Sequence, residues 1–516
     1  MPVNHSVNQK NQPALASGPD TAMENFTLFQ FFHWYYNADG NLWQHAQHEA
    51  DQLAEWGVTH VWLPPAFKSF KGTEEPGYAV YDLYDLGEFD QQGSVRTRYG
   101  TKAEYLQCIK TLQSKGLKVL ADIVLNHKLG ADEIEQIPVR KVNDENRNEY
   151  LSDQMTIDAY TKFTFPGRKG KYSKFIWDWH AFTGVCNDSD IHIILNEYSN
   201  GKWEDMLEEE NGNYDYLMGN DIEFRNPYVR KELKKWGEWY LNTTGVDGFR
   251  LDALKHITPN FFPEWLAYLD KRFKTRFFCV GEYWQNNVYT LLNYIATTHD
   301  RIQLFDVPLH FNFYDASQRG EEYDLRQIFD NTLVREKPES AITFVDNHDT
   351  QPLQSLQSTV EYWFKPLANA MILLREQGIP CIFYPTLYEA KYVDYQNGEE
   401  IYIELNKIEA VGTMMKVRRH LAFGRQHDYF NSPNMIGWTR EGIPEKPDSG
   451  CAVLLSNAEE GQEEMYLGPA NAHQIFIDVC GGRQEKVTLD EEGKGTFFTN
   501  GRSVSVWIAE EALPKL

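Results

Sequence analysis

Several features that define large classes of proteins are missing from this sequence of 516 residues. No run of about 18 apolar residues occurs, so the usual length criterion finds no membrane-spanning helix. The first 25 residues are polar and lack the apolar stretch that a signal peptide needs. We therefore expect residues 1–25 to form a disordered tail and the protein to be cytoplasmic, unless an original leader has been replaced.

Cysteine is scarce, and its spacing excludes the common cysteine-based sites. The six cysteines lie far apart and form no CxxC or zinc-finger pattern. Cys279 and Cys381 lie in apolar, strand-like runs, where a thiol acts as a small hydrophobic group. This usage indicates a reducing compartment. The sequence also contains no GxGxxG, P-loop, HExxH or GxSxG pattern.

Acidic residues outnumber basic residues, which limits the kinds of molecule that the protein can be expected to bind. The chain has 50 Lys and Arg against 75 Asp and Glu, a formal net charge of −25. This balance argues against nucleic acid and against an anionic membrane surface as partners. Aromatic residues, in contrast, make up 14% of the chain, and their flat rings suit a neutral ligand with apolar faces and hydroxyl edges, such as a sugar. A core rich in aromatic residues is the alternative explanation.

A repeating order of helix, glycine and buried strand predicts a large α/β fold. Apolar residues recur at helical spacing from Leu42 to Trp56, Gly57 follows, and an apolar run starts at Val58. The same order recurs around Gly116, Gly245 and Gly378. Strands that alternate with helices indicate right-handed βαβ units and a parallel sheet buried on both faces.

Eight strand-like segments can be counted, starting near residues 26, 59, 117, 246, 277, 302, 341 and 379. Their number predicts a (β/α)8 TIM barrel, although an open doubly wound sheet would also place ligands at the carboxyl ends of its strands. Two segments do not fit the repeat. Residues 128–222 are too long for a simple loop and are rich in Asp, Asn and Gly, so we expect a small inserted domain after the third strand. Residues 411–516 read as short strands separated by turns, which is typical of an antiparallel β-sandwich. The barrel would then comprise residues 26–127 and 223–410.

The stretch GVDGFRLDALKH (245–256) carries an unusual number of charges for a strand and its end. Arg250 and Asp252 are two residues apart, so on an extended backbone they project from the same side, where the guanidinium can keep the carboxylate ionised. An oriented carboxylate at a strand end is a candidate nucleophile. A buried Arg–Asp pair with a purely structural role is the alternative.

Polar side chains also follow other predicted strands. Asn126 and His127 follow one strand, Glu282 follows another, and Asp346, His348 and Asp349 follow a third. Polar side chains at the carboxyl ends of parallel strands are typical of the active site of a (β/α)8 barrel.

Four of these segments together resemble a known family. DIVLNH (122–127), GFRLDALKH (248–256), GEYW (281–284) and FVDNHD (344–349) are similar, in this order, to the four sequence regions of glycoside hydrolase family 13, the α-amylase family. NYDYLM (213–218), FDVPLHFN (305–312) and HDYFNS (427–432) extend the resemblance toward bacterial liquefying and intracellular α-amylases. The resemblance runs from about residue 26 to 509.

The resemblance implies a role for each candidate residue. Asp252 would be the nucleophile of a retaining hydrolase of α-1,4-glucans, Glu282 the acid and base, and Asp349 the carboxylate that stabilises the transition state. The remaining candidates would bind substrate or orient the carboxylates: Tyr78, His127, Arg250, Lys255, Trp284 and His348. Taken singly, a histidine after a strand, a tyrosine in a tyrosine-rich stretch or a lysine at a strand end has a simpler structural explanation.

The resemblance also implies a Ca²⁺ site. Asn126 from the barrel, Asp215 and Asp221 from the insertion, and the backbone carbonyl of His256 match the family's calcium ligands. Without the resemblance, an Asp- and Asn-rich loop would be read as a solvated surface loop.

We therefore expect an endo-acting α-amylase that works as a monomer on starch, glycogen or maltodextrin. The alternatives are an α-glucan transglycosylase on the same barrel and a non-catalytic glucan-binding protein. One departure from the family concerns the eighth strand, where Pro385 and Thr386 follow Tyr384 in place of a Gly–Asp pair. The loop that follows borders the expected cleft, so the length of the products stays open.

Overall fold

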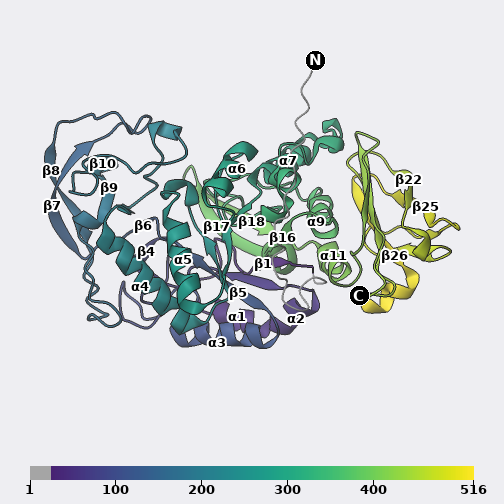
Figure 1. The fold of residues 1–516 in the computed structure, drawn as a ribbon, viewed down its shortest axis with the longest axis horizontal. Coiled ribbons are helices and arrows are strands. Elements are labelled where there is room, and N and C mark those ends of the chain that lie inside the picture. The colour runs from purple at the N-terminus through teal and green to yellow at the C-terminus, as the bar shows by residue number, and fades with distance from the viewer. Residues whose placement is uncertain (1–24) are drawn as a thin grey trace, which may run out of the picture.

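The computed structural model describes residues 25–516, so the tail predicted for residues 1–25 lies, except for Asn25, outside the described residues. Eight parallel strands close into a barrel at the centre of the molecule (Figure 1). Each strand begins within two residues of its predicted start. In barrel order they are β1 (Leu28–Gln30), β2 (His60–Leu63), β5 (Lys118–Ile123), β12 (Gly248–Leu251), β13 (Phe278–Gly281), β14 (Gln303–Phe305), β15 (Ala341–Phe344) and β16 (Ile379–Phe383). The predicted (β/α)8 fold is confirmed.

Helices follow the barrel strands and surround them (Figure 1). They are α1 (Leu42–His48), α2 (Ala50–Glu55), α3 (Lys102–Ser114), α4 (Pro227–Thr244), α5 (Phe261–Phe273), α6 (Val288–Thr297), α7 (Val307–Arg319), α8 (Leu333–Glu336), α9 (Lys365–Leu374), α10 (Pro385–Tyr388) and α11 (Glu409–His420). Short strands β3 (Lys68–Ser69) and β4 (Val80–Asp82) pair beside the barrel.

The end of α4 shows how local sequence delivers the chain to the strand that carries the candidate nucleophile. Leu233, Trp236 and Tyr240 recur at helical spacing and are buried. The helix ends at Gly245, whose backbone has a left-handed conformation with φ of 66° and whose N–H donates to Leu241 O. This conformation costs a glycine little, so the chain can turn sharply into β12.

The part of the chain that connects β5 to α4 forms an antiparallel sheet of six strands. This sheet is found at one end of the long axis of the molecule (Figure 1). It occupies the part of the chain for which we expected an inserted domain. In sheet order its strands are β6 (His127–Lys128), β11 (Asn220–Ile222), β9 (Phe182–Asn187), β10 (Asp190–Ile194), β7 (Glu133–Lys141) and β8 (Met155–Lys162). Because β6 directly follows the third barrel strand, the sheet is anchored next to the carboxyl ends of the barrel strands.

The divergent loop after the eighth strand forms a hairpin of β17 (Ala390–Gln396) and β18 (Glu399–Leu405). Tyr392 of this hairpin stacks on Tyr35 with a centroid distance of 4.1 Å, and its hydroxyl donates to Pro352 O at 2.9 Å. The hairpin is therefore attached to the loops that follow the first and seventh barrel strands.

The C-terminal part of the chain forms antiparallel sheets at the other end of the long axis (Figure 1). The larger sheet has the order β19 (Gln426–Tyr429), β20 (Met435–Arg440), β21 (Cys451–Ser456), β26 (Ser503–Ala509), β23 (Ile475–Asp478) and β24 (Lys486–Thr488), and β22 (Gly461–Tyr466) pairs with β25 (Lys494–Thr499). The boundary expected at residue 411 falls inside α11, which packs on α9 of the barrel. The strand-rich part thus begins only at β19. None of the helices in residues 25–516 is both long enough and apolar enough to cross a membrane.

Candidate active site

Arg250 is the centre of a network of charged side chains at the carboxyl ends of the barrel strands. Its side chain is 1% exposed, and its Nη1 donates to Asp122 Oδ1 at 3.0 Å and to Asp252 Oδ1. Its Nη2 donates to Glu282 Oε2 at 2.9 Å. One buried guanidinium therefore orients three carboxylates, two of which are the predicted nucleophile and acid.

The pairing of β12 with β13 brings the nucleophile and the acid together. Leu251 and Gly281 are partners at the ends of these two strands, and Asp252 and Glu282 come directly after them. Ala253 then adopts a left-handed conformation with φ of 52°, and its N–H donates to Glu282 Oε2 at 3.1 Å. The side chains of Asp252 and Glu282 keep 11% and 13% of their surface exposed, so a substrate can reach both.

Asp349 and His348 enter the same site from the loop after β15. His348 Nε2 lies 3.3 Å from Asp349 Oδ2, and His348 Nδ1 lies 3.0 Å from Gln30 Nε2 at the end of β1. Burial, together with the like charges of Glu282 and Asp252, raises the pKa of Asp349 well above its usual value. The structure thus gathers the three predicted catalytic carboxylates at the carboxyl ends of neighbouring barrel strands.

Stacked rings form one wall of this site. Tyr78 lies against His348 with a centroid distance of 5.0 Å, and Trp34 stacks on Tyr78 at 5.6 Å. The Tyr78 hydroxyl donates to Asp122 Oδ2 at 2.6 Å, while His127 Nε2 is 2.9 Å from Tyr78 O. The predicted sugar contacts Tyr78, His127 and His348 therefore lie side by side next to the carboxylates.

Burial sets the protonation of the two reacting carboxyl groups. Burial raises the pKa of Asp252 to about 6, and the neighbouring Arg250 guanidinium opposes this rise. Burial also raises the pKa of Glu282 to about 6, again against the pull of Arg250. The negative charge of Asp252 adds to the rise in the pKa of Glu282. Because both pKa values lie near neutral pH and the two charges interact, Glu282 can hold a proton while Asp252 is ionised.

The histidines of the site are neutral at neutral pH. Burial lowers the pKa of His127 to about 4, and burial together with the charge of Arg250 lowers the pKa of His348 well below its usual value. Neutral imidazoles can bind sugar hydroxyls without adding positive charge beside Asp252 and Glu282.

Two further predicted contacts lie at the edge of the site. Lys255 Nζ pairs with a Glu210 carboxylate from the inserted segment and lies 4.5 Å from the centre of the Tyr214 ring. Trp284 is half-buried, with its ring 6.0 Å from that of His310. Lys255 therefore joins the barrel to the insertion.

Asp122 was not among the residues predicted from the sequence. It accepts hydrogen bonds from Arg250, from Tyr78 and, at 3.0 Å, from Trp62 Nε1, and it is fully buried. The signal was present in the sequence, because Asp122 is the only acidic residue of β5 and has apolar neighbours there.

Replacing Asp122 by asparagine should shift the acid limb of the pH–rate profile to lower pH. The negative charge of Asp122 raises the pKa of Asp252, so its removal lowers that pKa. We also expect kcat to fall about 10- to 100-fold, because the asparagine NH₂ group replaces an oxygen that accepts a hydrogen bond, so at least one of the three donors loses its acceptor. The measurement is kcat/KM against pH on a soluble maltodextrin. Trp62→Phe, which removes one of the three hydrogen bonds but no charge, should leave the acid limb in place. If the acid limb of Asp122→Asn stayed in place, the charge of Asp122 would not set the pKa of Asp252.

The predicted calcium ligands lie together where the insertion meets the barrel. Asn126, Asp215 and Asp221 are each no more than 1% exposed. His256 lies beside them, with its Nδ1 2.8 Å from Tyr214 O. Within residues 25–516, no three His, Cys, Asp or Glu side chains are arranged to hold a metal by themselves, so an ion here needs amide and carbonyl oxygens as well.

Two observations test whether these residues fit a cation. Asn126 Oδ1 and Asp221 Oδ2 are buried oxygens without a hydrogen-bond partner. Burial and the nearby charges of Asp215, Glu204 and Glu223 raise the pKa of Asp221 well above its usual value, and burial raises the pKa of Asp215 to about 7. The nearby Arg225 already binds Glu223 through two nitrogens. Oxygen donors with unmet negative charge are the set that Ca²⁺ prefers, so the residues fit the ion.

Comparison with known proteins agrees with this geometry. The model of the alpha amylase catalytic domain matches residues 43–419. An alpha-amylase of Geobacillus stearothermophilus is 46% identical over 500 residues, covering 96% of this chain and 88% of the relative. The cytoplasmic alpha-amylase of Escherichia coli (strain K12) is 45% identical and is covered completely. A glucan 1,4-alpha-maltohexaosidase of Bacillus sp. (strain 707) is 42% identical over 488 residues, covering 94% of this chain and 92% of the relative.

Solved structures show the same fold. The alpha-amylase of Geobacillus thermoleovorans, complexed with acarbose, superimposes with a TM-score of 0.61 at 19% sequence identity, covering 94% of this chain and 97% of the other. The matched domain spans most of the chain, and the catalytic motifs of its family lie at the ends of the barrel strands. The chain therefore belongs to the α-amylase family of glycoside hydrolases and is an enzyme of that class.

Proposed function

We propose that this enzyme hydrolyses internal α-1,4-glucosidic bonds of starch, glycogen or maltodextrin with retention of configuration. The observation that carries the proposal is the placement of Asp252 and Glu282 on the two Nη atoms of one guanidinium. Retaining glycosidases have their two carboxyl groups about 5–5.5 Å apart, whereas inverting enzymes need about 6.5–9.5 Å to admit a water molecule. Two carboxyl groups held by the Nη1 and Nη2 atoms of one guanidinium fit the shorter, retaining separation.

Each carboxyl group then has a separate task. Asp252 attacks the anomeric carbon while Glu282 gives its proton to the glycosidic oxygen, so the C–O bond breaks and a covalent glycosyl–enzyme ester forms. Glu282, now ionised, takes a proton from water, which attacks the same carbon and releases Asp252. Asp349 would bind hydroxyls of the distorted sugar and stabilise the positive charge that develops on its ring.

The neighbouring side chains suit the binding of a glucan. Tyr78 would stack under the sugar that is attacked, and His127 and His348, neutral at working pH, would bind its hydroxyls. Lys255 and Trp284 would contact the chain on the leaving-group side. These roles follow from position beside the carboxylates and from the family resemblance.

Product analysis tests endo-action. Incubation with soluble starch should cause a rapid loss of iodine colour while few reducing ends have appeared, because internal cuts shorten long chains at once. Chromatography should show a range of maltodextrins in the first minutes. Early release of a single sugar size from chain ends would contradict the proposal, a relevant outcome because one relative is named for maltohexaose. Longer products without net gain of reducing ends would indicate transglycosylation instead.

We further propose that Ca²⁺ is held by Asn126, Asp215, Asp221 and the carbonyl oxygen of His256. The ion would supply positive charge where buried oxygens lack partners, and so tie the inserted sheet to the barrel. Its role would be structural, since none of these residues is Asp252, Glu282 or Asp349.

Removal of the metal should lower the melting temperature. A ligand that binds only the folded state stabilises it by mass action, so at a hundredfold excess over its Kd the gain is about 2.7 kcal/mol. Calorimetry of an extensively chelated sample, checked by elemental analysis, should show lower stability that returns with added Ca²⁺. The same melting temperature in the metal-free and the calcium-loaded enzyme would show that the ligand assignment is wrong.

We also propose that the enzyme acts in the cytoplasm and as a monomer. All six cysteines are unpaired, as a reducing compartment would keep them, and the E. coli relative is named for that compartment. Light scattering coupled to size exclusion would measure the oligomeric state directly.

A further inference from the structure

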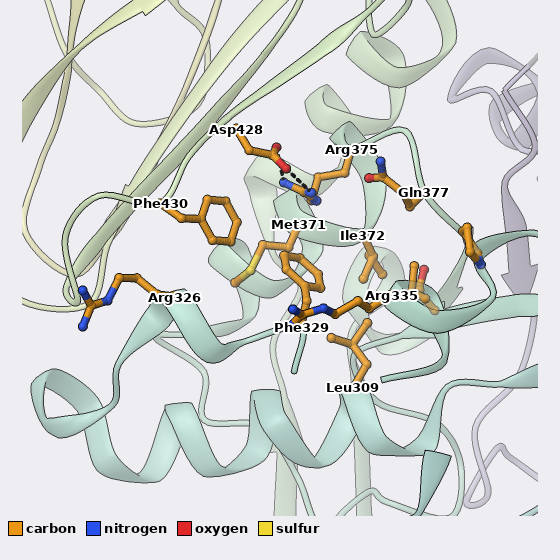
Figure 2. Close-up of a pocket in the computed structure, with 13 residues that line it drawn as sticks. Leu309, Arg326, Phe329, Arg335, Met371, Ile372, Arg375, Gln377, Asp428 and Phe430 are labelled. Carbon is orange, nitrogen blue, oxygen red and sulfur yellow. Dashed lines mark hydrogen bonds and ion pairs between the residues drawn. The ribbon is translucent and has the colours of Figure 1, made fainter. Parts of the chain in front are cut away.

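A cavity of about 500 Å³ lies away from the catalytic carboxylates, between the outer helices of the barrel and the start of the C-terminal sheet (Figure 2). This volume is within the range of small-molecule sites, about 300–1,000 Å³. Its apolar wall includes Leu309, Phe329, Met371, Ile372 and Phe430. None of the residues to which we assigned a role in catalysis or calcium binding lines it.

The charged lining of the cavity is mostly cationic. Three arginines and one carboxylate line it, in a chain whose net charge is −25. Arg375 and the carboxylate, Asp428, neutralise each other through two hydrogen bonds of 2.8 and 3.0 Å. The Arg375 guanidinium also lies 4.7 Å from the centre of the Phe329 ring. This pair therefore braces the barrel against the C-terminal sheet. The other two arginines pair with acidic residues outside the lining, Arg326 with Asp324 and Arg335 with Asp330.

Arg335 offers a free hydrogen-bonding edge beside the apolar wall. Only its Nη1 is engaged, by Asp330, while its Nε and Nη2 have no partner among residues 25–516. Figure 2 shows its side chain extending among the residues that line the cavity, whereas Arg326 points away from them. Arg326 is also held by Asp324 through Nε and Nη2. An Nε–Nη2 edge matches the two oxygens of a carboxylate or phosphate group.

Thr343 of β15 adds a second, independent observation. It lines the cavity and is 1% exposed, yet its Oγ1 has no hydrogen-bond partner. A buried hydroxyl without a partner is unfavourable, so its presence on the cavity wall points to a polar atom that occupies the cavity when a ligand is bound.

We propose that this cavity binds a small organic anion with an apolar body. The carboxylate or phosphate group binds the Nε–Nη2 edge of Arg335, the body packs against Phe329, Met371 and Ile372, and the Thr343 hydroxyl binds a further polar atom. A neutral glucan fits less well, since it would leave the guanidinium edge without an anion and place its hydroxyls on an apolar wall. The site goes beyond the proposed function and uses none of its residues.

Titration calorimetry with phenyl phosphate, benzoate and inorganic phosphate tests the proposal on the intact enzyme. Phenyl phosphate and benzoate should bind at one site per chain, and inorganic phosphate at least about tenfold more weakly, because it buries no apolar surface. Maltoheptaose, which occupies the catalytic cleft, should not displace them.

Three variants locate the site. Arg335→Gln should lower the affinity for phenyl phosphate about tenfold or more, as expected for loss of a charge-assisted bond. Thr343→Val should weaken binding but raise the melting temperature of the ligand-free protein, because it removes the unpartnered hydroxyl. The control is Arg319→Gln on α7, an arginine of similar exposure that pairs with Asp315 outside the cavity, and it should bind normally.

Several results would overturn the inference. These are the absence of binding by both organic anions, equal affinity for inorganic and phenyl phosphate, equal losses in Arg335→Gln and Arg319→Gln, or displacement by maltoheptaose. The opposite effects of Thr343→Val on affinity and on stability also separate a binding role from damage to the fold, which would lower both.

Discussion

Replacing Asp252 by asparagine is expected to lower kcat/KM on starch by about 10⁴-fold or more. The amide keeps the shape of the carboxylate, and its oxygen can still accept from Arg250, but it cannot form the glycosyl ester. Binding of maltodextrin should persist, because the rest of the site is unchanged. The measurement is reducing-end release together with calorimetric binding of a maltodextrin.

The loss should be as severe with an activated substrate. A glycosyl fluoride needs little protonation of its leaving group, yet it still needs a nucleophile, so Asp252→Asn should fail on both substrates. Asp349→Asn should also weaken turnover of both, since Asp349 holds the distorted sugar and moves no proton. Near-normal starch hydrolysis by Asp252→Asn, in a sample free of wild-type enzyme, would refute the mechanism.

Replacing Glu282 by glutamine is expected to lower starch hydrolysis about 10²–10⁴-fold, the usual contribution of general acid catalysis. The glutamine can keep the hydrogen bond from Arg250 Nη2, which at present is 2.9 Å from Glu282 Oε2. With the fluoride the loss should be much smaller than in Asp252→Asn, because fluoride departs without a strong acid. Equal losses on the two substrates would show that Glu282 does not act as the acid.

The pH dependence gives a second measurement on the same variant. The wild-type profile should be bell-shaped, falling at high pH as Glu282 loses its proton and at low pH as Asp252 gains one. Both groups have a pKa raised to about 6 by burial, so as coupled groups they should titrate in two steps on either side of that value. With the fluoride, Glu282→Gln should lose the alkaline limb and keep the acid limb. Survival of the alkaline limb would assign it to another group.

Both experiments depend on features that were visible in the sequence. The four motifs identified the three carboxylates. The order of helix, glycine and strand predicted the eight barrel strands, each of which begins within two residues of its predicted start. These features are local: an apolar helical face that ends at a glycine such as Gly245 directs the chain into the next strand whatever lies elsewhere. The place of Asp252 just after β12 follows from this local order.

The partners of Arg250 could not be predicted from local features of the sequence. Asp122 lies 128 residues earlier in the chain, and it meets Arg250 because β5 and β12 pair in a register that sets the two residues opposite each other. Likewise, the sequence showed the hairpin β17–β18 only as a stretch that diverges from the family. Its attachment depends on the contact of Tyr392 with Tyr35, which follows the first barrel strand. Contacts across such separations depend on how the sheet closes.

The sequence by itself determined which chemical groups stand at the ends of the barrel strands, because strand order and side-chain alternation are properties of short segments. Only the tertiary structure decided how those groups are charged. The pKa of a carboxyl group depends on its burial and on distances of a few ångströms to other charges, here Arg250, Asp122 and the facing carboxylates. Closure of the barrel sets those distances, and with them whether Asp252 is ionised when Glu282 holds its proton.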